Sequence, residues 1–144
     1  MSFPYISVNI DDDIDSKIEV DFNQPQRKLL AEAIALVNQA GRQRNEFSYM
    51  DALLSLRKAL IIREKILGDE HPDVAVVYNN MALVYSAQGD YDKALEFYLK
   101  AFKIELAVLT DKHPYTINTY DNLKSVFLKT GKMKTALTTG LRPK

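Results

Sequence analysis

Apolar residues recur every three or four positions from residue 26 onward, the spacing that places them on one face of an α-helix. Five helices and the start of a sixth are predicted from this spacing: 26–44, 49–67, 73–88, 91–109, 115–130 and 132–137. Pro72 and Pro114 stand where two helices begin, a position at which the missing N–H of proline costs nothing. Gly89 follows a predicted helix, and Gly140 and Pro143 end the last one early. The chain after residue 25 is therefore predicted to be all-α.

The first 25 residues have a different period. Apolar and polar residues alternate over 1–10 and again over 17–22, and the connection between these runs is rich in aspartate. This pattern favours a β-hairpin; the alternative is an acidic arm, because a lone hairpin is only marginally stable in water. The aspartates resemble the start of a calcium loop, but Phe22 stands where that loop requires a glutamate, so no metal site is expected. We therefore divide the chain into an acidic segment, 1–25, and a helical domain, 26–144.

The helical domain contains an internal repeat of 42 residues. His71-Pro72 and His113-Pro114 are separated by this offset, and aligning 49–72 on 91–114 gives ten identities in 24 positions. The same offset relates many further residues: Tyr49/Tyr91, Ala52/Ala94/Ala136, Leu53/Leu95/Leu137, Ala59/Ala101, Tyr78/Tyr120 and Gly89/Gly131. Three units of two helices each are predicted from the offset, over 26–67, 73–109 and 115–138, the last with a short second helix.

The middle unit has the spacing of large, small and aromatic residues by which two antiparallel helices pack on each other. The residues in this pattern are Tyr78, Met81, Ala82, Tyr85, Gly89, Ala94, Tyr98 and Ala101. Ala82 and Ala94 are expected where the helices approach closely, since a longer side chain there would overpack the contact. The pattern resembles the tetratricopeptide repeat, which implies an α-solenoid of stacked helix pairs. The generic unit of that family is about 34 residues long, and here each unit is longer.

The run from Ala59 to Asn80 resembles a particular subtype of this repeat. It reads Ala-Leu-Ile-Ile-Arg-Glu-Lys-Ile-Leu-Gly, followed after two residues by His-Pro-Asp-Val-Ala and then by Tyr-Asn-Asn. This run is similar to the 42-residue repeats of kinesin light chains, and the resemblance covers residues 33–137. Residues 1–32 do not resemble the coiled-coil part of those proteins. The resemblance implies a role in binding proteins.

The composition of the chain argues against several classes of function. The chain has 19 basic and 19 acidic residues, so a nucleic-acid partner is not expected, because phosphate binding needs a basic surface. It has no cysteine, which excludes thiol catalysis and thiolate metal sites. No apolar run is long enough to span a membrane, and the N-terminus lacks a signal pattern, so we expect a cytoplasmic protein without a membrane partner.

Asparagine occupies the same slot of the first helix in all three predicted units. The three residues are Asn38, Asn80 and Asn122. Each follows the aromatic or leucine slot by two residues, about 200° around the helix and away from the core-facing side. First helices line the inner wall of such a solenoid, so the amides should form a ladder along its groove. An amide carries a donor and an acceptor and can hold the backbone of an extended peptide. In the families that this chain resembles, asparagines at this slot hold peptide backbones.

Other residues are expected on the same groove from their helical phase. Those predicted to contact a peptide are Asn79, Asn118, Leu83, Ser86, Ser125, Lys129 and Arg44. The alternative reading is that the asparagines only make local hydrogen bonds or bridge adjacent units. Both histidines precede proline in matching loops, and no Ser, Cys or paired carboxylate recurs around them as a catalytic triad would require. We therefore expect no enzyme activity and no cofactor, and we take the histidines as loop spacers.

The last unit differs from the others. Its second helix is only a stub, which is expected to leave apolar residues uncovered among Leu123, Val126, Phe127 and Leu128. The end of the chain is also basic, with Lys124, Lys129 and Lys132 among its bases and no acid after Asp121. Two functions are compatible with this pattern. One is an adaptor that binds a peptide in its groove, and the other is a self-associating structural repeat in which the uncovered terminal helices form a homo-oligomer.

Overall fold

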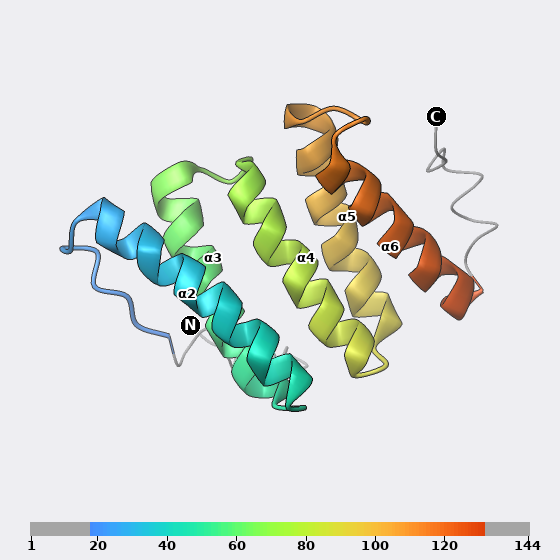
Figure 1. Cartoon of the computed structure of the whole chain (residues 1–144), viewed down its shortest axis with the longest axis horizontal. Helices are drawn as coiled ribbons and strands as arrows, with labels where there is room; N and C mark the ends of the chain where they lie inside the picture. The colour runs from blue at the N-terminus through green and yellow to red at the C-terminus, as the bar shows by residue number, and fades with distance from the viewer. Residues whose placement is uncertain (1–17, 132–144) are drawn as a thin grey trace, which may run out of the picture.

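The described part of the chain, residues 18–131 of a computed structural model, consists of helices joined by short loops (Figure 1). Five helices occur in that range: α2 (Gln26–Asn45), α3 (Tyr49–Leu67), α4 (Pro72–Ala87), α5 (Tyr91–Val108) and α6 (Pro114–Thr130). No strand occurs within residues 18–131. The five helices predicted within this range all form, with ends within a few residues of those expected. The stub predicted at 132–137 lies outside the described residues.

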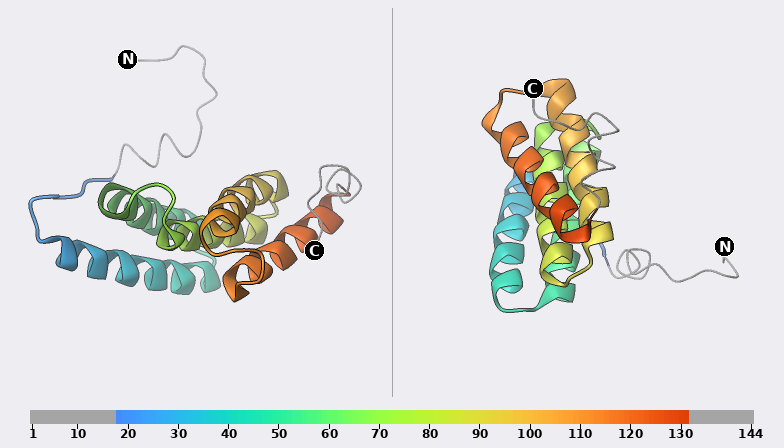
Figure 2. Two further views of the ribbon diagram at one scale, coloured as in Figure 1. Left: turned by 90° about the horizontal axis from the view of Figure 1, so that it is seen from above. Right: turned by 90° about the vertical axis from the view of Figure 1, so that its right-hand side faces the viewer.

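The helices are arranged as antiparallel pairs in two layers. Figure 1 looks onto α2, α4 and α6, and the views in Figure 2 show α3 and α5 behind them. Each helix packs against the next one in the chain, and α2 also contacts α4. The described helices thus form two complete pairs, α2–α3 and α4–α5, followed by α6, the first helix of a third pair. This is the all-α repeat predicted from the 42-residue offset.

Small residues allow the paired helices to approach closely. Seven alanines are completely buried in the helix contacts: Ala33, Ala52, Ala59, Ala75, Ala82, Ala94 and Ala101. Large side chains fill the remaining space, and the rings of Tyr85 and Phe97 stack with centroids 5.4 Å apart and planes 9° from parallel. This alternation of small and large residues is the packing that the sequence pattern of the middle unit predicts.

Glycine ends two of the helices in the same way. Gly89 follows α4 with φ of +82°, and Gly131 follows α6 with φ of +74°. Residues with a side chain are strained at such angles, so glycine is favoured where the backbone must turn sharply after a helix. The repeated glycine therefore contributes to the constant step between units.

The segment before α2 packs on the helices. Residues 18–21 have no regular secondary structure, and Ile18 and Val20 are partly buried against the helical core. The Lys65 ammonium of α3 lies 5.9 Å from the ring centroid of Phe22. The described part of the predicted strand 17–22 is therefore not a strand, because its apolar side chains contact helices instead of a paired strand. The rest of the predicted hairpin lies outside the described residues.

Candidate functional site

One surface of the helical array is formed by residues that recur with the 42-residue offset of the sequence. It is formed by the outward-facing residues of α2, α4 and α6, and we call it the first-helix face. Its residues are Ile34, Asn38, Gly41 and Asn45 on α2, Val76, Asn80, Leu83 and Ala87 on α4, and Asn118, Asn122, Ser125 and Lys129 on α6. Within each helix they are spaced i, i+4, i+7 and i+11, which is one stripe of an α-helix. All twelve are exposed or half-buried.

The three equivalent asparagines all belong to this face. Asn38 is exposed, and Asn80 and Asn122 are half-buried. The side-chain nitrogen of Asn80 donates a hydrogen bond of 2.8 Å to the carbonyl oxygen of Val76, one turn earlier in α4. This local bond uses a donor of the amide and leaves its oxygen as an acceptor.

Four other predicted residues lie on the same face: Leu83, Asn118, Ser125 and Lys129. Leu83 is half-buried and packs against the core at its edge, whereas Asn118, Ser125 and Lys129 are exposed on α6. Lys129 also places its ammonium 5.5 Å from the ring centroid of Tyr91. The face therefore offers amides and a hydroxyl beside the apolar side chains of Ile34, Val76 and Leu83.

Three predicted residues lie outside the first-helix face. Arg44 is half-buried and interacts with Tyr98 of α5: burial raises the pKa of Tyr98 to about 12, and the positive charge of Arg44 lowers it by less. Ser86 is the equivalent residue of α4, 42 positions later, and is also half-buried. The third, Asn79, is part of an internal contact. Arg44 and Ser86 lie on the flank of their helices next to the stripe and remain candidates for contact with a peptide, whereas the side-chain nitrogen of Asn79 is engaged between helices.

Asn79 joins three helices in a buried polar cluster. Its side-chain nitrogen donates to the Thr119 hydroxyl of α6 at 2.8 Å and to Oε2 of Glu105 of α5 at 3.3 Å. Glu105 is 1% exposed and Thr119 is completely buried. Burial raises the pKa of Glu105, and its interactions with Thr119 and Asn79 lower it by less. This cluster was not predicted from the sequence, in which its only signal is a glutamate between the apolar residues Ile104 and Leu106.

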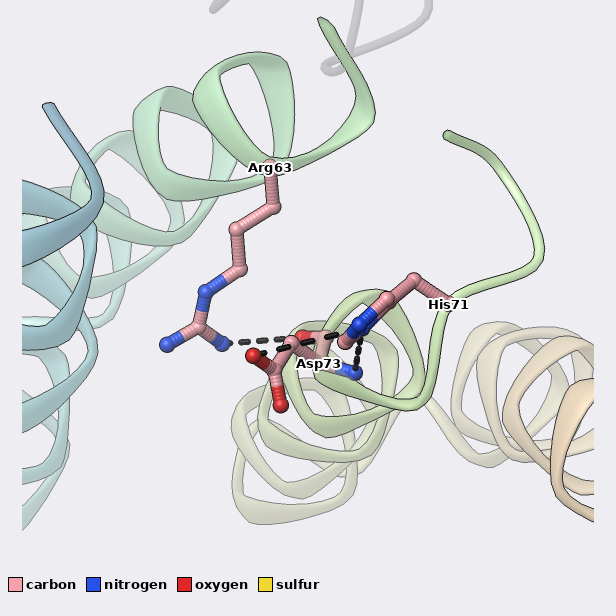
Figure 3. Close-up of polar contacts among 3 residues, drawn as sticks. All are labelled: Arg63, His71 and Asp73. Carbon is pink, nitrogen blue, oxygen red and sulfur yellow. Dashed lines mark hydrogen bonds and ion pairs between the residues drawn. The ribbon is translucent and has the colours of Figure 1, made fainter. Parts of the chain in front are cut away.

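The two histidines are helix caps. Figure 3 shows His71 at the start of α4, where its Nδ1 accepts a hydrogen bond of 2.9 Å from the backbone N–H of Asp73. Arg63 of α3 donates to the carbonyl oxygen of Asp73 at 2.8 Å and so ties this helix start to the preceding pair. His113 accepts from the N–H of Tyr115 at 3.0 Å at the start of α6. The loop-spacer interpretation was therefore incomplete, because the imidazole satisfies a backbone donor that the helix leaves without a partner.

Other kinds of site are not found in the described residues. Within residues 18–131, no group of three or more His, Asp and Glu side chains is placed to hold a metal ion. None of the helices in that range combines the length and apolar character needed to cross a membrane.

The comparison with known families agrees with the architecture. The family model described as tetratricopeptide repeat matches residues 31–107 and again residues 77–142. The two matches overlap and together cover more than half of the chain. No curated protein matches it. Repeats of this kind are non-catalytic scaffolds that generally bind other proteins. The chain belongs to the tetratricopeptide repeat family.

Proposed function

We propose that this protein is an adaptor that holds an extended segment of a partner protein against the first-helix face. The observation that carries the proposal is the position of Asn38, Asn80 and Asn122, which occupy equivalent places on three successive first helices. Side-chain amides spaced along one face can hydrogen-bond to the backbone of a peptide without reading its side chains. Partner selectivity then comes from the apolar residues beside them, among them Val76 and Leu83.

The resemblance to kinesin-light-chain repeats belongs to the same proposal. It rests on the 42-residue unit and on the run from Ala59 to Asn80, and it favours a peptide ligand over nucleic acid. We also propose a cytoplasmic location, the expectation of the sequence pattern, which fractionation of cells that produce the protein would test.

Peptide selection tests the proposed function. A library of displayed random peptides is selected against the full chain, and the affinity of a selected peptide is measured for wild type and for the double variant Asn80→Ala with Asn122→Ala. Each lost hydrogen bond is expected to weaken binding by about 1–3 kcal/mol. The matched control is Lys103→Ala on the exposed side of α5, which should bind as wild type does. Equal affinity of wild type and double variant for a peptide that competes at this face would refute the amide role.

Self-association is the second candidate function. Ile117 and Leu128 of α6 are 49% and 62% exposed, whereas Ala75, which is equivalent to Ile117, is completely buried. Exposed apolar side chains on a terminal helix are suited to contact with a second copy. Light scattering over a range of concentrations tests this candidate. A mass that rises with concentration in wild type, and that falls to the monomer in Leu128→Asp, would favour assembly as the function.

A further inference from the structure

The contact between consecutive repeats is built differently at its two occurrences. Where α4 packs on the first pair, the equivalent slots hold Val37, Arg63 and Val77; where α6 packs on the second pair, they hold Asn79, Glu105 and Thr119. Arg63 is 7% exposed, but its guanidinium reaches the Asp73 carbonyl oxygen at the start of α4. The Glu105 carboxyl group instead stays in the interior, where it interacts with Asn79 of α4 and Thr119 of α6. The second contact is therefore the only one of the two with a carboxyl group enclosed by three helices.

We propose that proton binding by Glu105 controls how firmly α6 docks onto α4 and α5. The group is enclosed, since Glu105 is 1% exposed and Thr119, which interacts with it, is not exposed at all. Burying a charged carboxylate is costly unless its oxygens are hydrogen-bonded. Oε1 of Glu105 is buried and accepts no hydrogen bond from any described residue. The enclosure thus favours the neutral carboxylic acid over the carboxylate.

The neighbouring polar atoms favour the same protonation state. Oδ1 of Asn79, whose side-chain nitrogen lies 3.3 Å from Oε2 of Glu105, is also buried without a hydrogen-bond partner among residues 18–131. A neutral carboxylic acid gains one O–H donor, which a carboxylate lacks, and buried acceptors without a partner are the groups that such a donor stabilises. Besides burial, the groups of residues 18–131 that shift the pKa of Glu105 are both neutral: the Thr119 hydroxyl of α6 and the Asn79 amide of α4. Ala101, one turn earlier on α5, is apolar.

The direction of the pH dependence follows from the raised pKa of Glu105. When α6 is undocked, the carboxyl meets water and ionises at its ordinary pKa. Docking is therefore strongest below that ordinary pKa and weakens as the pH rises toward the raised value, by at most about tenfold in the docking equilibrium per pH unit. Because α6 carries Asn118, Asn122, Ser125 and Lys129, the third part of the first-helix face depends on this equilibrium. The inference itself does not require that the face bind a peptide.

Hydrogen exchange of the full chain, followed by mass spectrometry at several pH values and corrected for the intrinsic rate, tests the proposal. In wild type, the protection of α6 peptides should fall as the pH rises above the ordinary glutamate pKa, while that of α2 and α3 peptides stays constant. In Glu105→Gln, which keeps the shape and supplies a permanent donor, α6 should remain protected at every pH. Glu96→Gln is the matched control, because Glu96 is an exposed residue of α5 paired with Lys93 and Lys100. This variant should behave as wild type does.

Two results would overturn the proposal. One is the same pH dependence of α6 protection in wild type and in Glu105→Gln, and the other is a pH response of equal size in α2 and α3, which would indicate global unfolding. Carbon NMR of the Glu105 carboxyl group in wild type provides a check that needs no variant. A titration midpoint at or below the ordinary glutamate value would also refute the proposal.

Discussion

His71 caps the start of α4 through Asp73: its Nδ1 accepts a hydrogen bond of 2.9 Å from the backbone N–H of Asp73. The acceptor must carry a lone pair, so the cap needs Nδ1 without its proton. His113 and Tyr115 repeat the arrangement at α6 over 3.0 Å. The His-Pro sequence at both loops thus combines a side-chain cap with a proline that already has helical φ.

Removing one cap should destabilise the fold measurably. His71→Ala leaves the Asp73 N–H without its acceptor, and we expect a loss of about 0.5–2 kcal/mol in the free energy of unfolding, measured by urea denaturation. His71→Asn, which provides a side-chain oxygen at the same place, should recover most of this loss. A His71→Asn variant as unstable as His71→Ala would show that the imidazole acts through packing and not as a cap.

The close contact between α4 and α5 should not tolerate a larger residue. Ala82 is completely buried, so Ala82→Leu forces neighbouring side chains or the helices apart and should cost about 1–3 kcal/mol in denaturation experiments. Ala87→Leu is the control on the same helix, because Ala87 is exposed and its replacement should change stability by less than about 0.5 kcal/mol. Similar losses for the two variants would contradict the small-into-large packing described for the pair.

Two tyrosines should make the fold sensitive to alkali. Burial is the main cause that raises the pKa of Tyr78 and of Tyr98 to about 12. The folded state favours the neutral phenol. The stability that each buried phenol contributes is therefore fully present below pH of about 10, the ordinary tyrosine pKa, and is lost as the pH rises toward 12. Ultraviolet titration of the folded protein should show two phenols that ionise late. Tyr98→Phe should remove one of them and reduce the loss of stability in that range, whereas late ionisation unchanged in Tyr98→Phe would assign it elsewhere.

The helices and the first-helix face could be predicted from the sequence for a specific reason. The offset of 42 residues keeps equivalent residues at the same helical phase, so Asn38, Asn80 and Asn122 had to share one face once each unit folded alike. Leu83 and Ser125 follow by the same phase argument. By contrast, the strand predicted from the alternation around Val20 was wrong for the described residues. A period of two cannot distinguish a paired strand from an irregular segment whose side chains pack on helices.

The residues at the edge of the face could not be predicted in this way. Asn79 precedes Asn80 in the sequence, yet it contacts Thr119 forty residues later, and this depends on which flank of α4 the next helix crosses. Helical phase alone does not determine a crossing angle. The burial of Glu105 could not be predicted for a related reason. A single charged residue in an apolar helix is expected to be exposed unless the neighbouring helices are known.

The most direct test of the binding face is the NMR signal of its own side-chain amides. In the full chain, the amide signals of Asn38, Asn80 and Asn122 are assigned and a selected peptide is titrated in. Direct hydrogen bonding predicts that all three signals shift together and saturate with the peptide, while that of Asn23, which lies before α2 and outside the face, stays in place. Saturable binding that leaves these three signals unchanged and instead perturbs α3, α5 or the exposed Ile117 and Leu128 would contradict the proposed site.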